Sequence, residues 1–256
     1  MSAPTLRVRN VAWRAPAGPD VLQKVSFDIE PGEFVAVMGR NGAGKSTLLD
    51  IIAGLRRPTE GSVTLAGRAL DEWPLIERAR VLAHLPQMLR ADLSVRAEAL
   101  VLMGRYPHAS RWFESDADLR IAREAMARCE CLEFRQRSLA TLSGGERQRV
   151  YLAACLAQHA QVLLLDEPAT FLDVDQQLQC LSVVRAEADR GVACMAVTHD
   201  VNLALTFCTR LLVVADRGIA RDVETAAALD DPSWLRAFSS RLNLERGPAG
   251  TWVRYR

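Results

Sequence analysis

The residues 39–46, which read GRNGAGKS, constrain the fold of this chain more than any other feature. They follow a continuous apolar run at residues 34–38, which is typical of a strand buried on both faces. The apolar spacing of residues 45–54 then indicates a helix that ends at a glycine. The three glycines allow a tight turn in which backbone N–H groups and the helix N-terminus face one point. This order of elements predicts a phosphate-binding loop.

Two side chains of this loop carry further chemistry. Lys45 places a positive charge where the β- and γ-phosphates of a nucleotide lie, and the Ser46 hydroxyl is a ligand for Mg²⁺. Lys45 also stands out because Lys24 is the only other lysine, so that arginine supplies 30 of the 32 basic residues. The predicted ATP-binding residues of the loop are Gly39, Arg40, Asn41, Gly42, Ala43, Gly44, Lys45, Ser46 and Thr47.

A second apolar run, residues 162–165, ends in two carboxylates, Asp166 and Glu167. Carboxylates at the carboxyl end of a buried parallel strand lie beside a phosphate loop, where open α/β sheets bind ligands. We therefore predict that Asp166 holds Mg²⁺ directly or through water, and that Glu167 orients the attacking water or accepts its proton. These two motifs alone are compatible with a kinase, a recombinase, a motor or another nucleotide-binding protein.

Apolar strands alternate with helices over much of the chain. Short runs at residues 81–85, 194–197 and 211–214 read as buried strands, whereas residues 94–158 are rich in Ala, Arg and Leu with helical spacing. The alternation predicts an α/β fold with a mostly parallel sheet covered on both faces, into which a helical block is inserted.

The sequence LSGGE at residues 142–146 narrows the functional class. It stands directly before an apolar-spaced helix at residues 147–158 and shortly before the Asp166 strand. With this motif in place, the chain closely resembles the ATP-binding cassette (ABC) family over about residues 5–220. The resemblance implies the P-loop NTPase fold with an N-terminal antiparallel β subdomain, ATP and Mg²⁺ as cofactors, and ATP hydrolysis as the activity.

The resemblance also assigns residues outside the two phosphate motifs. Gln87 resembles the family's glutamine that reaches the catalytic site and Mg²⁺, and His199 in VTHD resembles the histidine that contacts the γ-phosphate. Trp13 stands where the family usually has an aromatic residue stacked on adenine. The catalytic residues predicted in this way are Glu167, His199, Lys45 and Gln87, and the Mg²⁺ ligands are Ser46, Gln87 and Asp166.

In the family that the chain resembles, two cassettes form a head-to-tail sandwich with ATP at each interface. Ser143, Gly144 and Gly145 open a helix, so a hydroxyl, two unobstructed N–H groups and the helix dipole are available to an anion. We expect them to act in trans on the nucleotide of a second copy, together with Asp173. The segment FLDVD around Asp173 departs slightly from the form most relatives have.

Residues 104–108, GRYPH, resemble importer cassettes for iron chelates, haem and cobalamin. The resemblance then implies a homodimer beneath two transmembrane permease subunits, on the cytoplasmic face of the cell membrane, with a separate substrate-binding protein. Two alternatives stay open. One is a soluble ABC ATPase that acts on nucleic acid or ribosomes, which a single phosphate loop and a net charge of +1 disfavour. The other is the cassette of an exporter with a separate permease, which only GRYPH disfavours.

The domain prediction is a single ABC ATPase domain. Its core and β subdomain comprise residues 1–85 and 160–222, its helical subdomain about residues 88–158, and a C-terminal extension of one packed helix and strand residues 223–256. No apolar run approaches the roughly 20 residues that cross a bilayer, so we expect a soluble chain that reaches a membrane only through a partner. The six cysteines lack metal-site spacing and predict buried, reduced thiols.

Overall fold

A six-stranded sheet forms the centre of the computed structural model, which describes residues 5–16, 18–87, 94–109, 115–239, 241–247 and 250–255. The strand order is β10-β9-β3-β8-β7-β6, and all neighbours are parallel except β10, which runs antiparallel to β9. The strands are β3 (Phe34–Met38), β6 (Leu82–Leu85), β7 (Val162–Asp166), β8 (Ala193–Val197), β9 (Arg210–Ala215) and β10 (Gly218–Glu224).

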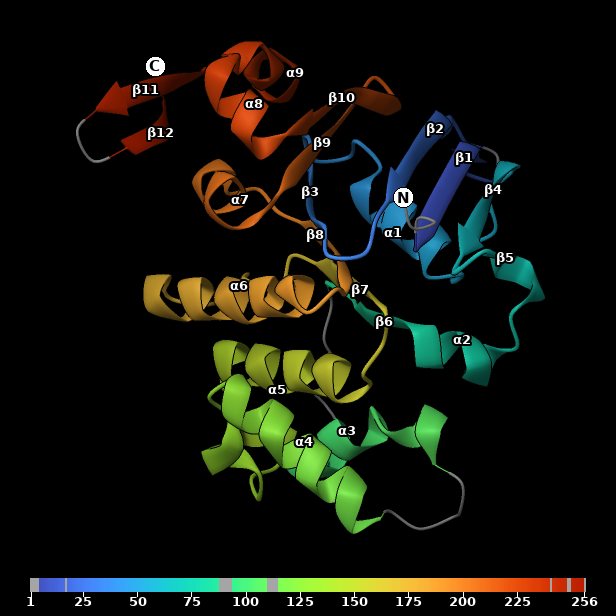
Figure 1. Ribbon diagram of the computed structural model, residues 1–256, viewed down its shortest axis with the longest axis vertical. Coiled ribbons are helices and arrows are strands. Elements are labelled where there is room, and N and C mark those ends of the chain that lie inside the picture. Colours follow the sequence, from blue (N-terminus) through green and yellow to red (C-terminus); the bar gives the residue numbers. More distant parts are fainter. Residues whose placement is uncertain are drawn as a thin grey trace.

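A second sheet, of four antiparallel strands, lies at the N-terminal side (Figure 1). Its order is β2-β1-β4-β5, and its inner face is built from alternate residues of β1 and β2, as period-two patterning requires. Helix α1 (Lys45–Ile52) packs its apolar side into the same core. The strands are β1 (Leu6–Arg14), β2 (Asp20–Ile29), β4 (Glu60–Leu65) and β5 (Arg68–Ala69).

The central sheet separates two hydrophobic cores. Along β3, Phe34 and Ala36 point into the core shared with the helical part, whereas Val35 and Val37 point into the core shared with the antiparallel sheet. Both faces of the strand are therefore buried, which explains why β3 reads as an unbroken apolar run.

Helix α2 precedes β6 in the chain, α3, α4 and α5 lie between β6 and β7, and α6 lies between β7 and β8 (Figure 1). Helices α3, α4 and α5 pack on one another, and α4 and α5 each begin with a capping box, at Ser115 and Ser143. The helices are α2 (Leu75–Val81), α3 (Ala97–Met103), α4 (Asp116–Arg128), α5 (Gly144–Ala157) and α6 (Val174–Asp189), with 3-10 turns at Leu70–Glu72, Tyr106–His108, Leu132–Phe134 and Leu139–Thr141.

The C-terminal part packs against the edge of the central sheet that β9 and β10 form. It ends in a hairpin, whose strand β12 is fixed to α7 by the Asn202 side chain: the Val253 N–H donates to Asn202 Oδ1 at 2.7 Å, and Asn202 Nδ2 donates to the Val253 carbonyl at 3.2 Å. The elements are α7 (Val201–Phe207), α8 (Thr225–Asp230), a 3-10 turn at Pro232–Trp234, α9 (Leu235–Phe238), β11 (Leu242–Gly247) and β12 (Gly250–Tyr255).

The predicted fold class is confirmed: a mostly parallel core sheet, an antiparallel N-terminal sheet and an inserted helical block are all present. The sequence analysis did not predict α2, β5 or β10, and the tail holds a two-stranded hairpin rather than a single strand. Strand β10 is a largely exposed edge strand without a continuous apolar run, although Ile219 and Val223 pack against the cores and Asp222 pairs with Arg210 of β9. The six cysteines are buried, unpaired thiols as predicted. The domain boundaries stay a prediction, and residues 88–93 of the helical subdomain lie outside the described residues.

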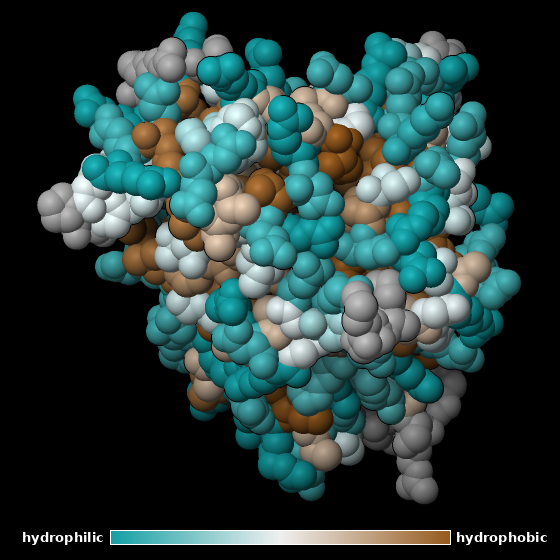
Figure 2. Space-filling view, turned by 45° about the horizontal axis from the view of Figure 1, so that its top comes forward, coloured by the Kyte–Doolittle hydropathy of each residue, from teal (hydrophilic) through white to brown (hydrophobic). Residues whose placement is uncertain are grey.

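The surface shown in Figure 2 is mostly hydrophilic, with hydrophobic residues in small separate areas. No helix within the described ranges is long and apolar enough to span a bilayer. Large apolar side chains that are exposed among the described residues are Leu55, Leu75, Ile76, Met103, Tyr106, Phe171, Val174, Leu178 and Trp252.

Two glycines of the antiparallel sheet allow a controlled test of its packing. Gly61 and Gly67 have nearly the same backbone angle, φ +82° and +80°, but a Cβ on Gly61 would collide with the carbonyl oxygens of Arg9 and Asn10, whereas a Cβ on Gly67 would meet nothing within 4 Å. We expect Gly67→Ala to cost only the left-handed strain, about 1–2 kcal/mol. Gly61→Ala should cost about 2 kcal/mol more, because backbone must shift.

Urea unfolding of the two variants measures this difference directly. Equal losses of stability would mean that the β1–β4 packing is looser than described.

Candidate functional site

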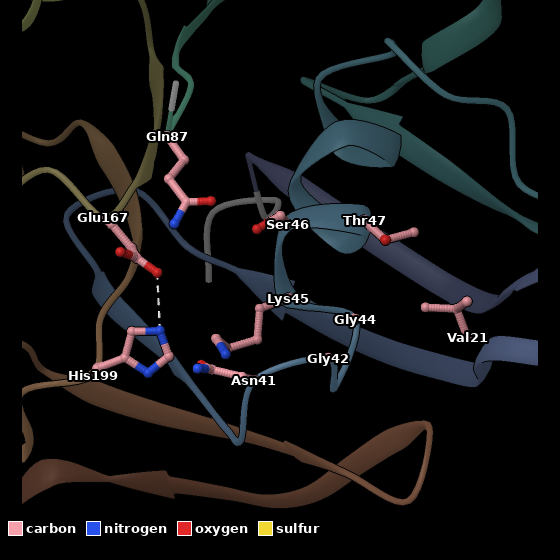
Figure 3. Close-up of a pocket in the computed structure, with 10 residues that line it drawn as sticks. All are labelled: Val21, Asn41, Gly42, Gly44, Lys45, Ser46, Thr47, Gln87, Glu167 and His199. Atoms are coloured by element: carbon pink, nitrogen blue, oxygen red, sulfur yellow. Dashed lines mark hydrogen bonds and ion pairs between the residues drawn. The ribbon is translucent and has the colours of Figure 1, made fainter. Parts of the chain in front are cut away.

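A cavity of about 560 Å³ opens at the carboxyl ends of the central strands (Figure 3). Its wall comes from the loops after β3, β6, β7 and β8, which meet there because parallel strands bring their carboxyl ends to one edge of the sheet. In Figure 3 the Lys45 loop and α1 face Gln87, Glu167 and His199 across the cavity. The lining residues are Val21, Asn41, Gly42, Gly44, Lys45, Ser46, Thr47, Gln87, Glu167 and His199.

The loop after β3 depends on glycine at two points. Gly39 lies against the Val214 carbonyl so closely that a Cβ would collide with it. Gly44 has φ +97°, and a Cβ there would come within 2.8 Å of Leu22 Cδ2. Residues that line the cavity from this loop therefore owe their positions to a backbone path that only glycine permits.

Lys45 closes this loop on itself. Its ammonium donates to the carbonyls of Gly39 and Arg40, at 2.9 and 3.1 Å, and the side chain is only 6% exposed. Burial lowers the pKa of Lys45, and the nearby carboxylates Glu167 and Asp166 oppose that shift. An ammonium in a partly desolvated cavity, with one N–H not used by these carbonyls, suits an anionic ligand.

Asp166, the last residue of β7, is buried with an oxygen, Oδ1, that has no hydrogen-bond partner. Burial raises the pKa of this carboxyl, and a hydrogen bond from Ser46 opposes the rise. A buried carboxylate oxygen without a partner is costly unless a ligand completes it. Next to the Ser46 hydroxyl, it provides the hard oxygen donors that Mg²⁺ prefers, so these residues fit the predicted ion.

Glu167 is held by both of its carboxylate oxygens. Oε1 shares a hydrogen bond of 2.9 Å with His199 Nε2, drawn as the dashed line in Figure 3, and Oε2 accepts from Thr170 Oγ1 at 3.0 Å. The backbone of Glu167 has φ +54°, a strained conformation for a non-glycine residue that is typical of functional sites. Thr170 was missed by the sequence analysis; its only sequence signal is its position three residues after the glutamate.

The LSGGE motif of residues 142–146, which we call the signature, lies outside this cavity lining, and so does Asp173. Ser143 and Glu146 form the capping box that opens α5: the Ser143 hydroxyl accepts from the Glu146 N–H, and the Glu146 carboxylate accepts from the Ser143 N–H at 2.6 Å. Asp173 similarly caps α6 through the Gln176 N–H at 2.9 Å. These four predicted ATP-binding residues, which include Gly144 and Gly145, are therefore not brought together with Lys45 in one copy of the chain.

Gln148 is a second residue that the sequence analysis missed. It is 4% exposed, and its Nε2 donates to the Pro168 carbonyl at 2.9 Å. This hydrogen bond joins α5, which carries the signature, to the segment directly after Glu167.

Trp13 is a predicted ATP-binding residue that lies outside the cavity lining. The Arg56 guanidinium lies over the Trp13 ring, 4.3 Å from the ring centroid. Stacking of Trp13 on adenine stays a prediction.

The chain is similar in sequence to known proteins over most of its length. The family profile described as ABC transporter matches residues 22–170. A hemin import ATP-binding protein from Gloeobacter violaceus is 48% identical over 78% of this chain and 75% of its own length. One from Pseudomonas aeruginosa is 41% identical over 95% and 96%, respectively. A cobalamin import ATP-binding protein from Halobacterium salinarum is 42% identical over 91% of this chain and 58% of its own length.

A solved structure extends the comparison. A dimeric ATP-binding cassette in a post-hydrolysis state, bound to ADP and phosphate, superposes with a TM-score of 0.76 at 26% identity, and covers 86% of this chain and 98% of its own. The described fold is thus that of ATP-binding cassettes.

Because one oxygen of the buried Asp166 carboxylate has no partner, we expect Asp166→Asn to stabilise the nucleotide-free protein. Because burial raises the pKa of Asp166 above 3.8, the folded state holds the proton more tightly than the unfolded state. This carboxyl therefore lowers the free energy of unfolding as the pH rises through that range. Without nucleotide and divalent ions, Asp166→Asn should raise stability at pH 7 by about 1 kcal/mol, or about 2–4 °C in Tm.

The gain should shrink as the pH falls towards 4, where the native side chain also becomes neutral. Thermal unfolding at several pH values measures it, with the exposed Asp71→Asn as a control that changes little. A loss of stability at pH 7 would contradict the description of Asp166 as an unpaired buried charge.

Proposed function

The chain belongs to the ABC transporter family, and from that membership we propose that it is the subunit of a membrane importer that couples ATP hydrolysis to transport of a metal chelate. The ATPase activity and ATP as its substrate follow from the family. The observation that supports the catalytic assignment is the Glu167 carboxylate, held between Thr170 and His199 on the wall of the cavity that Lys45 also lines.

In this proposal the loop of residues 39–47 binds the phosphates of ATP. The Lys45 ammonium balances the charge of the β- and γ-phosphates, and the backbone N–H groups at the start of α1 donate to them. Glu167 orients a water for in-line attack on the γ-phosphorus and accepts its proton. His199 keeps Glu167 in place and contacts the γ-phosphate, and Thr170 fixes the second carboxylate oxygen.

The proposed ligands of Mg²⁺ are Ser46, Asp166 and Gln87. When bound, the ion neutralises charge on the phosphates that are being separated. Asp166 contributes its otherwise unpartnered oxygen, and Gln87 lies on the cavity wall after β6, where its amide oxygen can turn towards the same point.

The working unit that we propose is a head-to-tail homodimer. Ser143, Gly144, Gly145 and Asp173 do not line the cavity of their own chain, so a second copy would have to supply them to it. The Ser143 side chain and the N–H groups of Gly144 and Gly145, at the positive end of the α5 dipole, suit the γ-phosphate of a nucleotide held by the partner copy. ATP then closes the dimer and hydrolysis releases it.

A surface around α2 supports docking of a permease. Five of the nine exposed large apolar side chains named above lie on α2 or within three residues of a segment that contacts α2, and we call these residues the α2 patch. Arg78 of α2 lies against Gly54, and Arg80 Nε donates to the Pro107 carbonyl at 2.6 Å, so α2 joins the end of α1 to the GRYPH segment. The patch consists of Leu55, Leu75, Ile76, Met103 and Tyr106.

The cargo that we propose is haem or a related metal chelate, such as cobalamin or a ferric siderophore. Relatives named for hemin and cobalamin import support this class. A substrate-binding protein delivers the chelate to the permease, and the ATPase works from the cytoplasmic face of the membrane.

Glu167→Gln tests the catalytic assignment. Glutamine keeps the size and the contacts to Thr170 and His199 but cannot accept a proton, so hydrolysis should fall by at least about 100-fold. ATP binding should change little, and the variant should accumulate as an ATP-bound dimer. Phosphate release, nucleotide binding and sedimentation measure the three effects, with the exposed Glu133→Gln as control. Undiminished hydrolysis would rule out Glu167 as the residue that activates water.

Affinity purification from native membranes in mild detergent tests the importer assignment. We expect a very hydrophobic permease to co-purify, and a haem- or corrinoid-like absorption band would identify the cargo class. Tyr106→Asp should reduce the permease recovered, whereas Leu178→Asp, a comparable change on α6 outside the α2 patch, should not. Recovery of ribosomes or of soluble partners alone would replace the importer by a cassette that acts elsewhere.

A further inference from the structure

Phe171 combines two unfavourable features. Its side chain is 77% exposed, the highest value among the exposed large apolar residues of the described chain, and its backbone has φ +69°. A left-handed backbone costs a bulky non-glycine residue roughly 1–2 kcal/mol. An exposed aromatic ring leaves its large apolar surface in water. In a single copy the Phe171 ring stays in water, and a strained residue in such a position points to a function.

The segment that carries Phe171 is firmly held on both sides. Thr170 is tied to Glu167 through its hydroxyl and its N–H, the Leu172 side chain is buried at 7% exposure, and Asp173 caps α6. The ring therefore does not owe its exposure to a loose loop. The fold presents it outward in a fixed position.

Phe171 lies directly beside the signature. A Cβ built on Gly144 would come within 3.5 Å of Phe171 Cβ, and one on Gly145 within 3.2 Å of the Phe171 carbonyl oxygen. On the other side of Asp173, Val174 is 71% exposed. Two large apolar side chains thus flank Asp173, next to the start of α5.

We propose that Phe171 and Val174 form an apolar contact with a second copy of this chain, which seals the rim of the ATP sandwich. The inference rests on the proposed function, because the partner is taken to be the second copy in the head-to-tail dimer. Gly144 lies beside Phe171, and Asp173 lies between Phe171 and Val174 in the sequence. Both belong to the surface that the proposed dimer brings to the partner's nucleotide. Burial of both side chains on closure recovers the apolar area that a single copy leaves in water. The same contact excludes water from the rim of the phosphate site.

The test uses the full chain with Glu167→Gln as the parent, since this variant should hold ATP in the closed dimer. The dissociation constant of the dimer is measured by analytical ultracentrifugation with saturating ATP. We expect Phe171→Gly to raise this constant at least tenfold and Val174→Ala to raise it by a smaller factor. Trp252→Ala, which removes an exposed apolar side chain from the C-terminal hairpin, should leave it unchanged.

The Tm of the nucleotide-free monomer separates a dimer contact from a structural role of Phe171. If the ring only contacts the partner copy, Phe171→Gly should keep or raise this Tm, because glycine adopts φ +69° without strain. A clear fall in that Tm, or a dimer constant equal to that of the parent, would overturn the inference while leaving the proposed function intact. If the parent itself stays monomeric with ATP, both the proposed dimer and this contact are wrong.

Discussion

The parallel pairing of β3, β8 and β7 determines where the phosphate loop and the catalytic side chains that follow β7 and β8 lie. Val35 pairs with Met195, and Leu164 pairs with Met195 on the other side, so the three strands end together. The phosphate loop, the Asp166–Glu167 pair and His199 each follow directly from one of these ends. Because both faces of the strands are buried in separate cores, a slip of one residue would exchange the two cores. The site is thus fixed by the packing beneath it.

The sequence could predict the parts of the site where the backbone conformation requires particular residue types. The loop around Lys45 needs glycine at set positions, and buried parallel strands read as apolar runs, so both stand out. Thr170 and Gln148 could not be found in this way, since a threonine in a turn and a glutamine on a helix are common and gain meaning only from Glu167 and Pro168. Strand β10 was not predicted because only Ile219 and Val223 of its seven residues pack against the cores, which is too few for an apolar pattern.

The connection between β7 and α6 holds two residues with a strained backbone. Glu167 and Phe171 both have left-handed backbones there, four residues apart. Hydrogen bonds to Thr170 and the buried Leu172 side chain hold the connection, so the cost is met by contacts that are independent of any ligand. The first strained residue points into the cavity and the second points outward, which places the catalytic carboxylate and the proposed dimer contact on one short rigid segment.

The scarcity of lysine gives the buried ammonium a practical use. Lys24 is exposed on β2, whereas Lys45 is bonded to two carbonyls inside the cavity, and no other side chain carries a primary amine. An acylating reagent should therefore modify Lys24 quickly and Lys45 slowly. The ratio of the two acylated peptides in a mass spectrum would then report occupancy of the nucleotide cavity from within a single molecule, with Lys24 as its internal standard.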